Sequence, residues 1–462
     1  VGNLNLEYQK PNINNREESV NLAISSPGVT ENTTLLFGED EWNASIGGDY
    51  AFPLGRGDLK LIGYGRFERS PSSIVFNTFQ AGTQVSGSKF QRLTKEGERI
   101  GRAEYSWSPK TGHDWQIAAE GAFNFFDTAT LLQTRQNDGS YGDDSTGATR
   151  VEEKRGEITV TYGRPFGDKL QVQTSLGAEY SELSQTGANA AAGTRDFFRP
   201  KGFVTATYSP DENQSIRLRA ERKVGQLNFS DFVASVTLDD DLDTVSNPNL
   251  VPDQRWVSEV QYDKLFAGDS SFKLTVFGEL ISDLVDRIPV GDGDAVGNIE
   301  NAHSYGIIAE TTLKGAHWGF PGTELELFAD FRRSSLTDPI SGESRFFNRD
   351  RIYHLSADFR HDIQGTDWAY GFGSSYGRSA KTYRASSIAK GIANTPSLTA
   401  FIEHKDIYGL KVNVQANNIL SAARLTQTNF FDDRRDLGML ERIERRDITG
   451  DINFEIEVSG TF

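Results

Sequence analysis

The chain of 462 residues contains no cysteine, a single methionine and no long apolar run. The lack of cysteine excludes disulfide bonds, thiol catalysis and thiolate metal sites. No apolar stretch approaches the roughly 18 residues that a membrane-spanning helix needs. The mean hydropathy of −0.50 still permits a membrane β-barrel, because a barrel strand exposes only every second residue to lipid.

Positive charge is also scarce. There are 48 Lys and Arg residues against 65 Asp and Glu residues, which gives a net charge of −17. Binding of nucleic acid depends on clustered Lys and Arg, so this balance argues against nucleic acid as a partner. Acidic loops and a hydrated lumen would carry such a charge. No signal peptide is visible, and we expect a mature or shortened chain.

Strict alternation of apolar and polar residues is the main positive signal. Successive side chains of a strand point to opposite faces, so an alternating segment has one apolar and one polar face. At the end of the chain Glu455 and Glu457 occupy the polar parity. The apolar parity holds Ile452, Phe454, Ile456, Val458 and Phe462. The same alternation recurs in segments 42–52, 169–180, 216–221, 324–332 and 410–417.

Two all-β folds alternate in this way. A soluble sandwich of two stacked sheets has apolar inner faces and polar outer faces, whereas a membrane barrel has an apolar outer face and a wet lumen. Aromatic residues gather near the ends of the expected strands, which favours interfacial girdles over packing in a soluble core. They are Trp42, Tyr50 and Phe52 in one segment and Trp368, Tyr370, Phe372 and Tyr376 in another.

The pattern predicts an all-β chain folded as a transmembrane antiparallel β-barrel of 20–22 strands, most simply 22, in a single domain covering residues 1–462. Compact turns rich in Pro, Gly and Asx occur at 52–57, 108–112, 164–168 and 209–213. Longer polar stretches occur at 134–150, 236–252, 286–300 and 420–446. Short periplasmic turns and long extracellular loops are the arrangement of outer-membrane barrels.

A resemblance to a known family appears in the second half of the chain. Asn247, Pro248, Leu250 and Pro252, followed by Asp253, Trp256 and Glu259, resemble a segment that leads into a mid-barrel strand of the TonB-dependent outer-membrane receptors. Asp253 stands where that family usually has Glu. Asn417-Asn418-Ile419-Leu420 is similar to the penultimate strand of the family, and Phe454, Ile456, Val458 and Phe462 resemble its terminal assembly signal.

The resemblance implies a 22-stranded barrel plugged by an N-terminal globular domain. No stretch of about 130–150 residues precedes the first expected strand, so we expect the plug to be absent from this sequence, either removed or supplied by another chain. The implied partners are outer-membrane lipid and lipopolysaccharide, the TonB complex through a plug, a separate plug or surface lipoprotein, and the barrel assembly machinery. No cofactor is expected.

Other motifs give weaker hypotheses. Asp239, Asp240, Asp241 and Asp243 suggest a calcium loop, although the glycine and distal glutamate of an EF-hand are missing. Asp292 and Asp294, which alternate with Gly291 and Gly293, suggest a second one, and solvated surface charge is the alternative for both. Five basic residues are candidates for lumen-facing rungs, either paired with carboxylates or selecting anions. They are Arg217, Arg219, Lys223, Arg332 and Arg333. No nucleophile elbow or triad signature is present, so we do not expect an enzyme.

The functional hypothesis is a receptor barrel in the outer membrane of a Gram-negative bacterium. It would capture a scarce nutrient, such as a siderophore, vitamin, sugar or peptide, and import it with energy from the TonB system. Long loops and the lumen wall would bind the substrate. A passive porin-like channel and a structural barrel in a surface complex are the alternatives.

Overall fold

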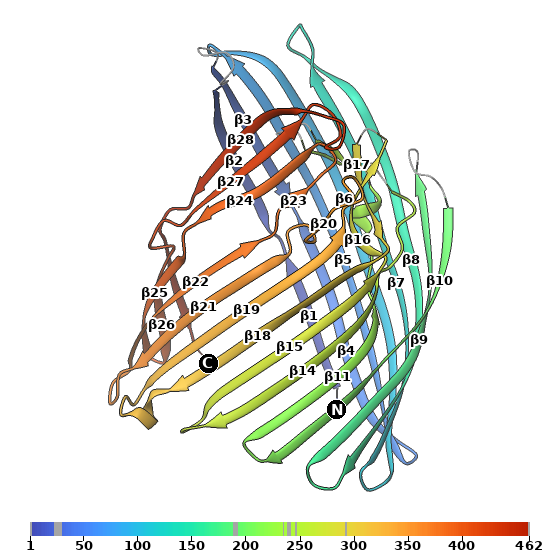
Figure 1. Ribbon diagram of the computed structural model, residues 1–462, viewed down its shortest axis with the longest axis vertical. Helices are drawn as coiled ribbons and strands as arrows, with labels where there is room; N and C mark the ends of the chain where they lie inside the picture. Colours follow the sequence, from blue (N-terminus) through green and yellow to red (C-terminus); the bar gives the residue numbers. More distant parts are fainter. Residues whose placement is uncertain are drawn as a thin grey trace. The chain divides into compact units, whose positions relative to one another are not determined.

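The computed structural model describes residues 2–22, 30–187, 193–233, 235–237, 242–244, 247–291 and 293–460. Most of these residues lie in β-strands, and the only helices among them are two short 3-10 turns (Figure 1). No helix in the described ranges is long and apolar enough to cross a membrane. The chain divides into two compact units. Unit 1 comprises Val1–Gly163, Ser175–Gly202 and Gln226–Leu250, and unit 2 comprises Arg164–Thr174, Phe203–Gly225 and Val251–Phe462.

Unit 1 contains the longest strands. Its elements are β1 (Gly2–Gln9), β2 (Asn12–Leu22), β3 (Thr30–Asp40), β4 (Trp42–Leu54), β5 (Gly57–Gln80), β6 (Thr83–Lys110), β7 (His113–Arg135), β12 (Ser235–Thr237), β13 (Leu242–Thr244) and the helix η1 (Phe229–Phe232). Three strands contribute residues to both units: β8 (Tyr141–Phe166), β9 (Leu170–Gly187) and β10 (Gly193–Asp211).

Unit 2 contains shorter strands and structured loops. Its elements are β11 (Gln214–Val224), β14 (Gln254–Phe266), β15 (Ser270–Ser282), β16 (Leu284–Val290), β17 (Gly293–Ile299), β18 (Ala302–Lys314), η2 (Gly315–Trp318), β19 (Thr323–Thr337), β20 (Ser344–Arg345), β21 (Arg351–Asp362), β22 (Trp368–Ser379), β23 (Thr382–Tyr383), β24 (Ser387–Asn394), β25 (Ser397–Ile407), β26 (Leu410–Asn417), β27 (Ala423–Phe431), β28 (Leu440–Thr449) and β29 (Asn453–Ser459).

The described strands of the main sheet number 21, and their pairings are antiparallel. In unit 1 the strands β4 to β8 pair in chain order. In unit 2 the order is β14, β15, β18, β19, β21, β22, β25, β26 and β29. Sequential antiparallel pairing confirms the predicted antiparallel all-β fold.

Some of these strands are pieces of one pass. Gln9 of β1 pairs with Asn43, and Asn12 of β2 pairs with Asp40, so both strands keep one register. Pro11 lies between them, and proline has no N–H to donate to a ladder. The strand count therefore exceeds the number of passes across the sheet, and the expected 22 passes stay a prediction.

Burial on the main sheet is the reverse of that in a soluble protein. On β9 the side chains of Leu176 and Tyr180 are 71% and 50% exposed, whereas Ser175 and Glu179 are only 6% and 9% exposed. Exposed large apolar residues also line β1, β14 and β29. A face of this kind would be unstable in water and is stable against hydrocarbon, which confirms the predicted polarity of the alternation.

Ion pairs satisfy the covered polar face. In unit 1 the ammonium of Lys201 contacts the carboxylates of Glu157 and Glu179, the second at 2.9 Å. In unit 2 Asp330 is fully buried and accepts from Arg332 at 2.9 Å. Buried charges persist where they are paired in this way.

The apolar core of the described residues is small. One buried cluster in unit 2 consists of Ile281, Leu284, Ala302 and Leu336, with Ile299 and Phe347 packed against it. A sandwich of this length would bury an extended apolar layer between two sheets. The exposed apolar face and the small core therefore exclude the soluble alternative.

The connections between strands match the predicted short turns, but they differ from the predicted long loops. Turns occur at the expected short connections, with Gly55, Gly112 and Gly167 at positive φ, where glycine costs least. The expected long loops are more ordered than predicted. Segment 134–150 is mostly the paired ends of β7 and β8, 286–300 is mostly the β16–β17 hairpin, and 420–446 contains β27 and most of β28. Hairpin pairing satisfies backbone groups even where the side chains are polar, and composition does not reveal this.

Candidate substrate site

A segment of unit 1 lies on the polar face of β6, β7 and β8. Residues 226–232 lead into the helix η1, where Asn228 accepts a hydrogen bond from the backbone N–H of Ser230 at 3.1 Å. Phe232 is fully buried, and Gln185 donates to its carbonyl oxygen at 3.3 Å. This anchoring holds the segment against the strand wall.

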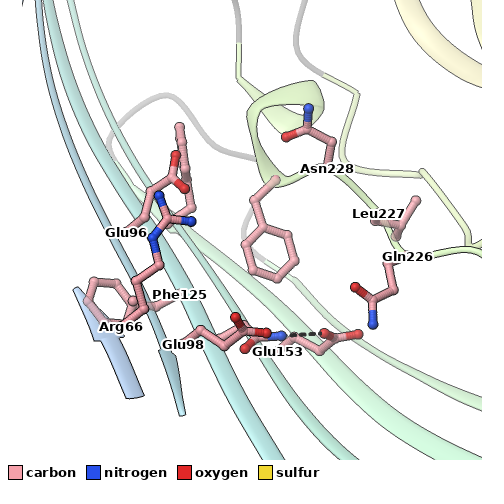
Figure 2. Close-up of a pocket in the computed structure, with 12 residues that line it drawn as sticks. Arg66, Glu96, Glu98, Phe125, Glu153, Gln226, Leu227 and Asn228 are labelled. Atoms are coloured by element: carbon pink, nitrogen blue, oxygen red, sulfur yellow. Dashed lines mark hydrogen bonds between the residues drawn. The ribbon is translucent and has the colours of Figure 1, made fainter. Parts of the chain in front are cut away.

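A cavity of about 210 Å³ lies between this segment and the strands (Figure 2). Figure 2 shows Arg66, Glu96, Glu98 and Glu153 of the strands on one side and Gln226, Leu227 and Asn228 on the other. The remaining lining residues are Gly97, Asn124, Phe125, Phe126 and Phe229. The cavity thus combines a largely polar wall from β5, β6, β7 and β8 with a cover of two polar and two apolar residues from the segment.

The electrostatics of the cavity are acidic. Three glutamates line it against one arginine, and that guanidinium is bound to Glu68 of its own strand. Asn124 donates to Glu153 at 3.2 Å, while its carbonyl oxygen Oδ1 is buried without a hydrogen-bond partner in the structure. Glu96 and Glu98 have no side-chain hydrogen bond or salt bridge within the described residues. The unpaired carboxylates of Glu96 and Glu98 and the free Oδ1 of Asn124 are acceptors, so the cavity suits a ligand rich in hydroxyl, amide or ammonium donors.

Unit 2 carries a second polar assembly, which joins four connections through buried aspartates and arginines. We call it the loop network. Its residues are Asp286, Asp294, Asp338, Arg345, Asn348, Tyr383, Arg384 and Arg435. They come from the β16–β17 hairpin, the β19–β21 connection, the β22–β25 connection and the β26–β29 connection.

Asp338 is the centre of the loop network. It accepts from Arg345 at 2.6 Å and from Arg435 at 3.1 Å, and the backbone N–H groups of Ile340 and Ser341 donate to it at 2.9 and 3.0 Å. Burial by itself raises the pKa of Asp338, but these four donors outweigh it and hold the pKa below its ordinary value.

The arginines of the loop network also stack. The guanidinium carbon Cζ of Arg345 lies 4.9 Å, and that of Arg435 lies 5.3 Å, from the ring centre of Tyr383. Asp286 accepts from Arg345 at 3.4 Å and from Asn348 at 2.6 Å. Pairing, stacking and burial together indicate a fixed arrangement of these connections within unit 2.

The residues of the family resemblance lie in the approach to β14. Asn247 accepts from the backbone N–H of Asn249 at 3.0 Å, and Leu250 is fully buried with its carbonyl bound by Arg195. The backbone of Val251 exchanges hydrogen bonds with the amide of Asn298. Pro248 and Pro252 are part of this turn, and Glu259 follows on β14. These contacts position the chain at the start of β14.

The calcium candidates lie mostly outside the described residues. Asp239, Asp240, Asp241 and Asp292 belong to that part, and for Asp243 only the backbone is described, in β13. Asp294 is buried, accepts from Arg287 at 2.9 Å and Arg384 at 3.1 Å, and so is neutralised by arginine. In the described ranges no group of three or more His, Cys, Asp or Glu is placed to hold a metal ion.

The expected basic rungs are largely paired with carboxylates. Arg217 contacts Glu259 at 3.2 Å, Arg219 contacts Glu221 at 3.1 Å and Lys223 contacts Glu279 at 3.7 Å. Arg332 contacts Asp330. Arg333 departs from the expectation, because it lies opposite Tyr305 on the apolar face and not on the polar face. Adjacent residues of a strand face opposite ways, so Arg332 and Arg333 could not both face the lumen.

The expected assembly signal is partly described. Phe454, Ile456 and Val458 are highly exposed on one face of β29, which pairs with β26. Phe462 lies outside the described residues. The role of these side chains in assembly stays a prediction.

Comparison with known proteins identifies the fold. The siderophore receptor PiuA from Acinetobacter baumannii matches with a TM-score of 0.58 at 9% identity, over 99% of this chain and 78% of its own. The copper transporter OprC matches with a TM-score of 0.60 at 9% identity, over 100% and 80%. The ferric citrate transporter FecA matches with a TM-score of 0.57 at 10% identity, over 98% and 75%. No family model and no curated protein matches the sequence.

These matches span nearly the whole chain, so the likeness concerns the fold as a whole and not one motif. At 9–10% identity it shows the architecture alone. The chain has the antiparallel β-barrel fold of the TonB-dependent outer-membrane receptors, as the sequence predicted.

Proposed function

We propose that this chain forms the barrel of a TonB-dependent receptor in the outer membrane of a Gram-negative bacterium, and that it imports a scarce nutrient. The observation that carries the proposal is the reversed burial of the main sheet, with apolar residues exposed and a charged face covered. The full-length likeness to receptors and transporters supports it. Such a sheet has one face for lipid and one for a hydrated lumen.

The substrate would bind on the polar face and on the connections at the long-loop end. The acidic cavity beneath residues 226–232 favours a ligand rich in hydrogen-bond donors, because its free groups are carboxylate and amide oxygens. The loop network holds the connections of unit 2 in one arrangement. A plug, carried by the same protein or supplied by another chain, is needed to make transport depend on TonB.

Growth tests decide between import and passive flux. The gene is deleted in its own host, nutrients are limited one at a time, and the wild-type gene is restored in strains with and without TonB. Active import predicts that restoration of growth requires TonB. Restoration in the strain that lacks TonB, together with free passage of small sugars into liposomes that contain the protein, would show a passive channel instead.

Binding to the cavity has its own test. Exchange of Glu98 for Gln removes one free carboxylate, and we expect uptake at low nutrient concentration to fall with little change at saturation. Glu182→Gln is the matched control, because Glu182 lies elsewhere on the sheet and pairs with Lys154. If both substitutions reduce uptake equally, the cavity is not the substrate site.

A further inference from the structure

A row of aromatic rings marks one level of the apolar face in unit 2. Tyr305 of β18, Phe331 of β19, Tyr353 of β21 and Tyr376 of β22 share this face. The ring centres of Phe331 and Tyr353 are 6.4 Å apart, and those of Tyr353 and Tyr376 are 5.8 Å apart. Rings of this kind lie where hydrocarbon gives way to water.

Cations lie next to the rings on the same face. Arg378 lies two residues past Tyr376 on the same face of β22 and opposite Tyr353, and Arg333 lies two residues past Phe331 on β19. Both arginines are exposed, and both lie toward the ends of strands that lead into longer connections. Positive charge therefore stands beside the aromatic rings on the apolar face, toward the ends of these strands.

Arg378 opens into a groove that holds more cations. The groove has a volume of about 480 Å³ and is lined by Arg349, Arg378, Lys390 and Arg424, with no acidic residue. Within the described residues none of these four side chains forms a salt bridge. In a chain of net charge −17, four exposed cations that form no salt bridge at one groove make a local positive surface that attracts an anion.

The groove also has apolar walls. Tyr376 and Ile392 are exposed in its lining, which also includes Ala380 and Ala389. Cations beside an aromatic row and next to exposed apolar side chains match a molecule with anionic groups at the head and hydrocarbon below. A small soluble anion would contact the cations alone, whereas a lipid would also contact the neighbouring apolar side chains.

We propose that this groove binds the phosphate groups of an anionic lipid of the outer leaflet. The proposal rests on the membrane orientation given under Proposed function, and it names a lipid contact that transport itself does not require. Arg378, Lys390 and Arg424 bind the phosphates, and Tyr376 and Ile392 contact the upper part of the lipid.

The test uses the full chain in detergent with two probes, lipid A carrying its two phosphates and lipid A from which the phosphates have been removed. Native mass spectrometry measures the fraction of protein that retains each lipid. A cation near an anionic surface contributes about fivefold in affinity, so the triple variant R378Q/K390Q/R424Q should retain on the order of 100-fold less phosphorylated lipid. Dephosphorylated lipid should bind wild type and variant equally weakly.

A matched control removes three positive charges elsewhere. Lys110, Lys169 and Lys264 are exposed near the short turns, and the variant K110Q/K169Q/K264Q should retain lipid as wild type does. Circular dichroism and heat-dependent gel migration confirm that all variants are folded. Equal retention by wild type and R378Q/K390Q/R424Q would overturn the proposal.

Two further outcomes also count against it. Equal retention of phosphorylated and dephosphorylated lipid would show that phosphate is not recognised. Saturable binding of inorganic pyrophosphate without retention of lipid A would assign the groove to a soluble ligand. Because the readout is lipid retention, a failed growth test of import leaves this result unaffected, and the reverse also holds.

Discussion

Asp338 is a single residue that holds together several connections of the loop network. Two arginines from positions 7 and 97 residues away donate to one buried carboxylate. The sequence contains 65 acidic residues and gives no reason to select this one. Its importance comes only from chain connections that meet in space.

Exchange of Asp338 for Asn should loosen the loop network. The amide keeps the shape of the side chain but removes the negative charge that balances the buried guanidinium groups of Arg345 and Arg435. Removal of one partner of a buried ion pair lowers stability by about 3–5 kcal/mol. Hydrogen exchange of residues 338–350 and 432–440 should become faster, while exchange in β14 and β15 stays unchanged. Asp436→Asn is the control, because its pair with Arg434 is at the surface; if it has the same effect, the network is not the cause.

Acid should loosen the same connections. The pKa of Asp338 lies below its ordinary value of 3.8, so the carboxylate is better stabilised in the folded protein than in an opened loop. Its contribution to stability is fully present above that ordinary value and is lost as the pH falls through the folded pKa. Cleavage of the connections by pepsin, an acid-active protease, should therefore rise steeply at the low end of its range.

The D338N variant separates this residue from other carboxylates. It should be cleaved readily across the whole range, without the steep rise. A wild-type protein whose cleavage does not change with pH would contradict the assignment, as would an equal pH dependence in the variant.

At the scale of the element, the strand is the unit in which the sequence is informative. Ile307 and Ile308 are chemically identical neighbours on β18, yet Ile307 lies opposite Val276 on the apolar face and Ile308 lies between Thr275 and Asp330 on the polar face. Alternation assigns the two faces without any tertiary contact. The pair therefore offers a direct test of which face meets lipid.

Ile307→Arg should destabilise the barrel far more than Ile308→Arg. An arginine on the lipid face costs about 2–4 kcal/mol near the middle of the membrane, whereas at position 308 it reaches the carboxylate of Asp330 and the hydrated face. Urea-induced unfolding from lipid vesicles measures both variants. Equal loss, or a larger loss for Ile308→Arg, would show that the faces have been assigned the wrong way round.

The segment over the acidic cavity is an element that the sequence did not reveal. Its polar residues resemble an ordinary loop, and the anchoring of Phe232 depends on Gln185 of a distant strand. We expect Phe232→Ala to free the segment, since loss of a fully buried phenylalanine costs about 3–5 kcal/mol. Faster hydrogen exchange of residues 226–233 measures this.

Phe198→Ala is the control for that change. It removes the same side chain from an exposed position on β10 of unit 1. Exchange of the segment should then stay as in wild type. A segment that remains protected in Phe232→Ala would show that the helix η1 is held by other contacts.

At the scale of the whole molecule, the balance of surfaces predicts a requirement for lipid. Leu4, Leu6, Phe454 and Ile456 belong to the exposed apolar face, and such a surface would aggregate in water. Protein unfolded in urea should regain β-structure and protease resistance on dilution into phosphatidylcholine vesicles, and should precipitate on dilution into buffer alone. Recovery of a soluble folded protein in buffer would contradict the membrane reading.

The sequence by itself determined the class of fold, the two faces of each strand and the short turns. These follow from neighbours in the chain, because the period of two and the conformations of glycine and proline are local properties. The position of Ile308 on the polar face and that of Arg333 on the apolar face also follow from parity once β18 and β19 are paired.

Tertiary structure alone decided the sites. The acidic cavity, the loop network and the basic groove each gather residues from three or more segments that lie far apart in the chain. No period connects such segments, and hairpins made of polar residues form because their backbone groups must be paired. Alternation along each strand determines whether a residue lies on the apolar or the polar face. The register between distant strands determines which charged side chains form pairs.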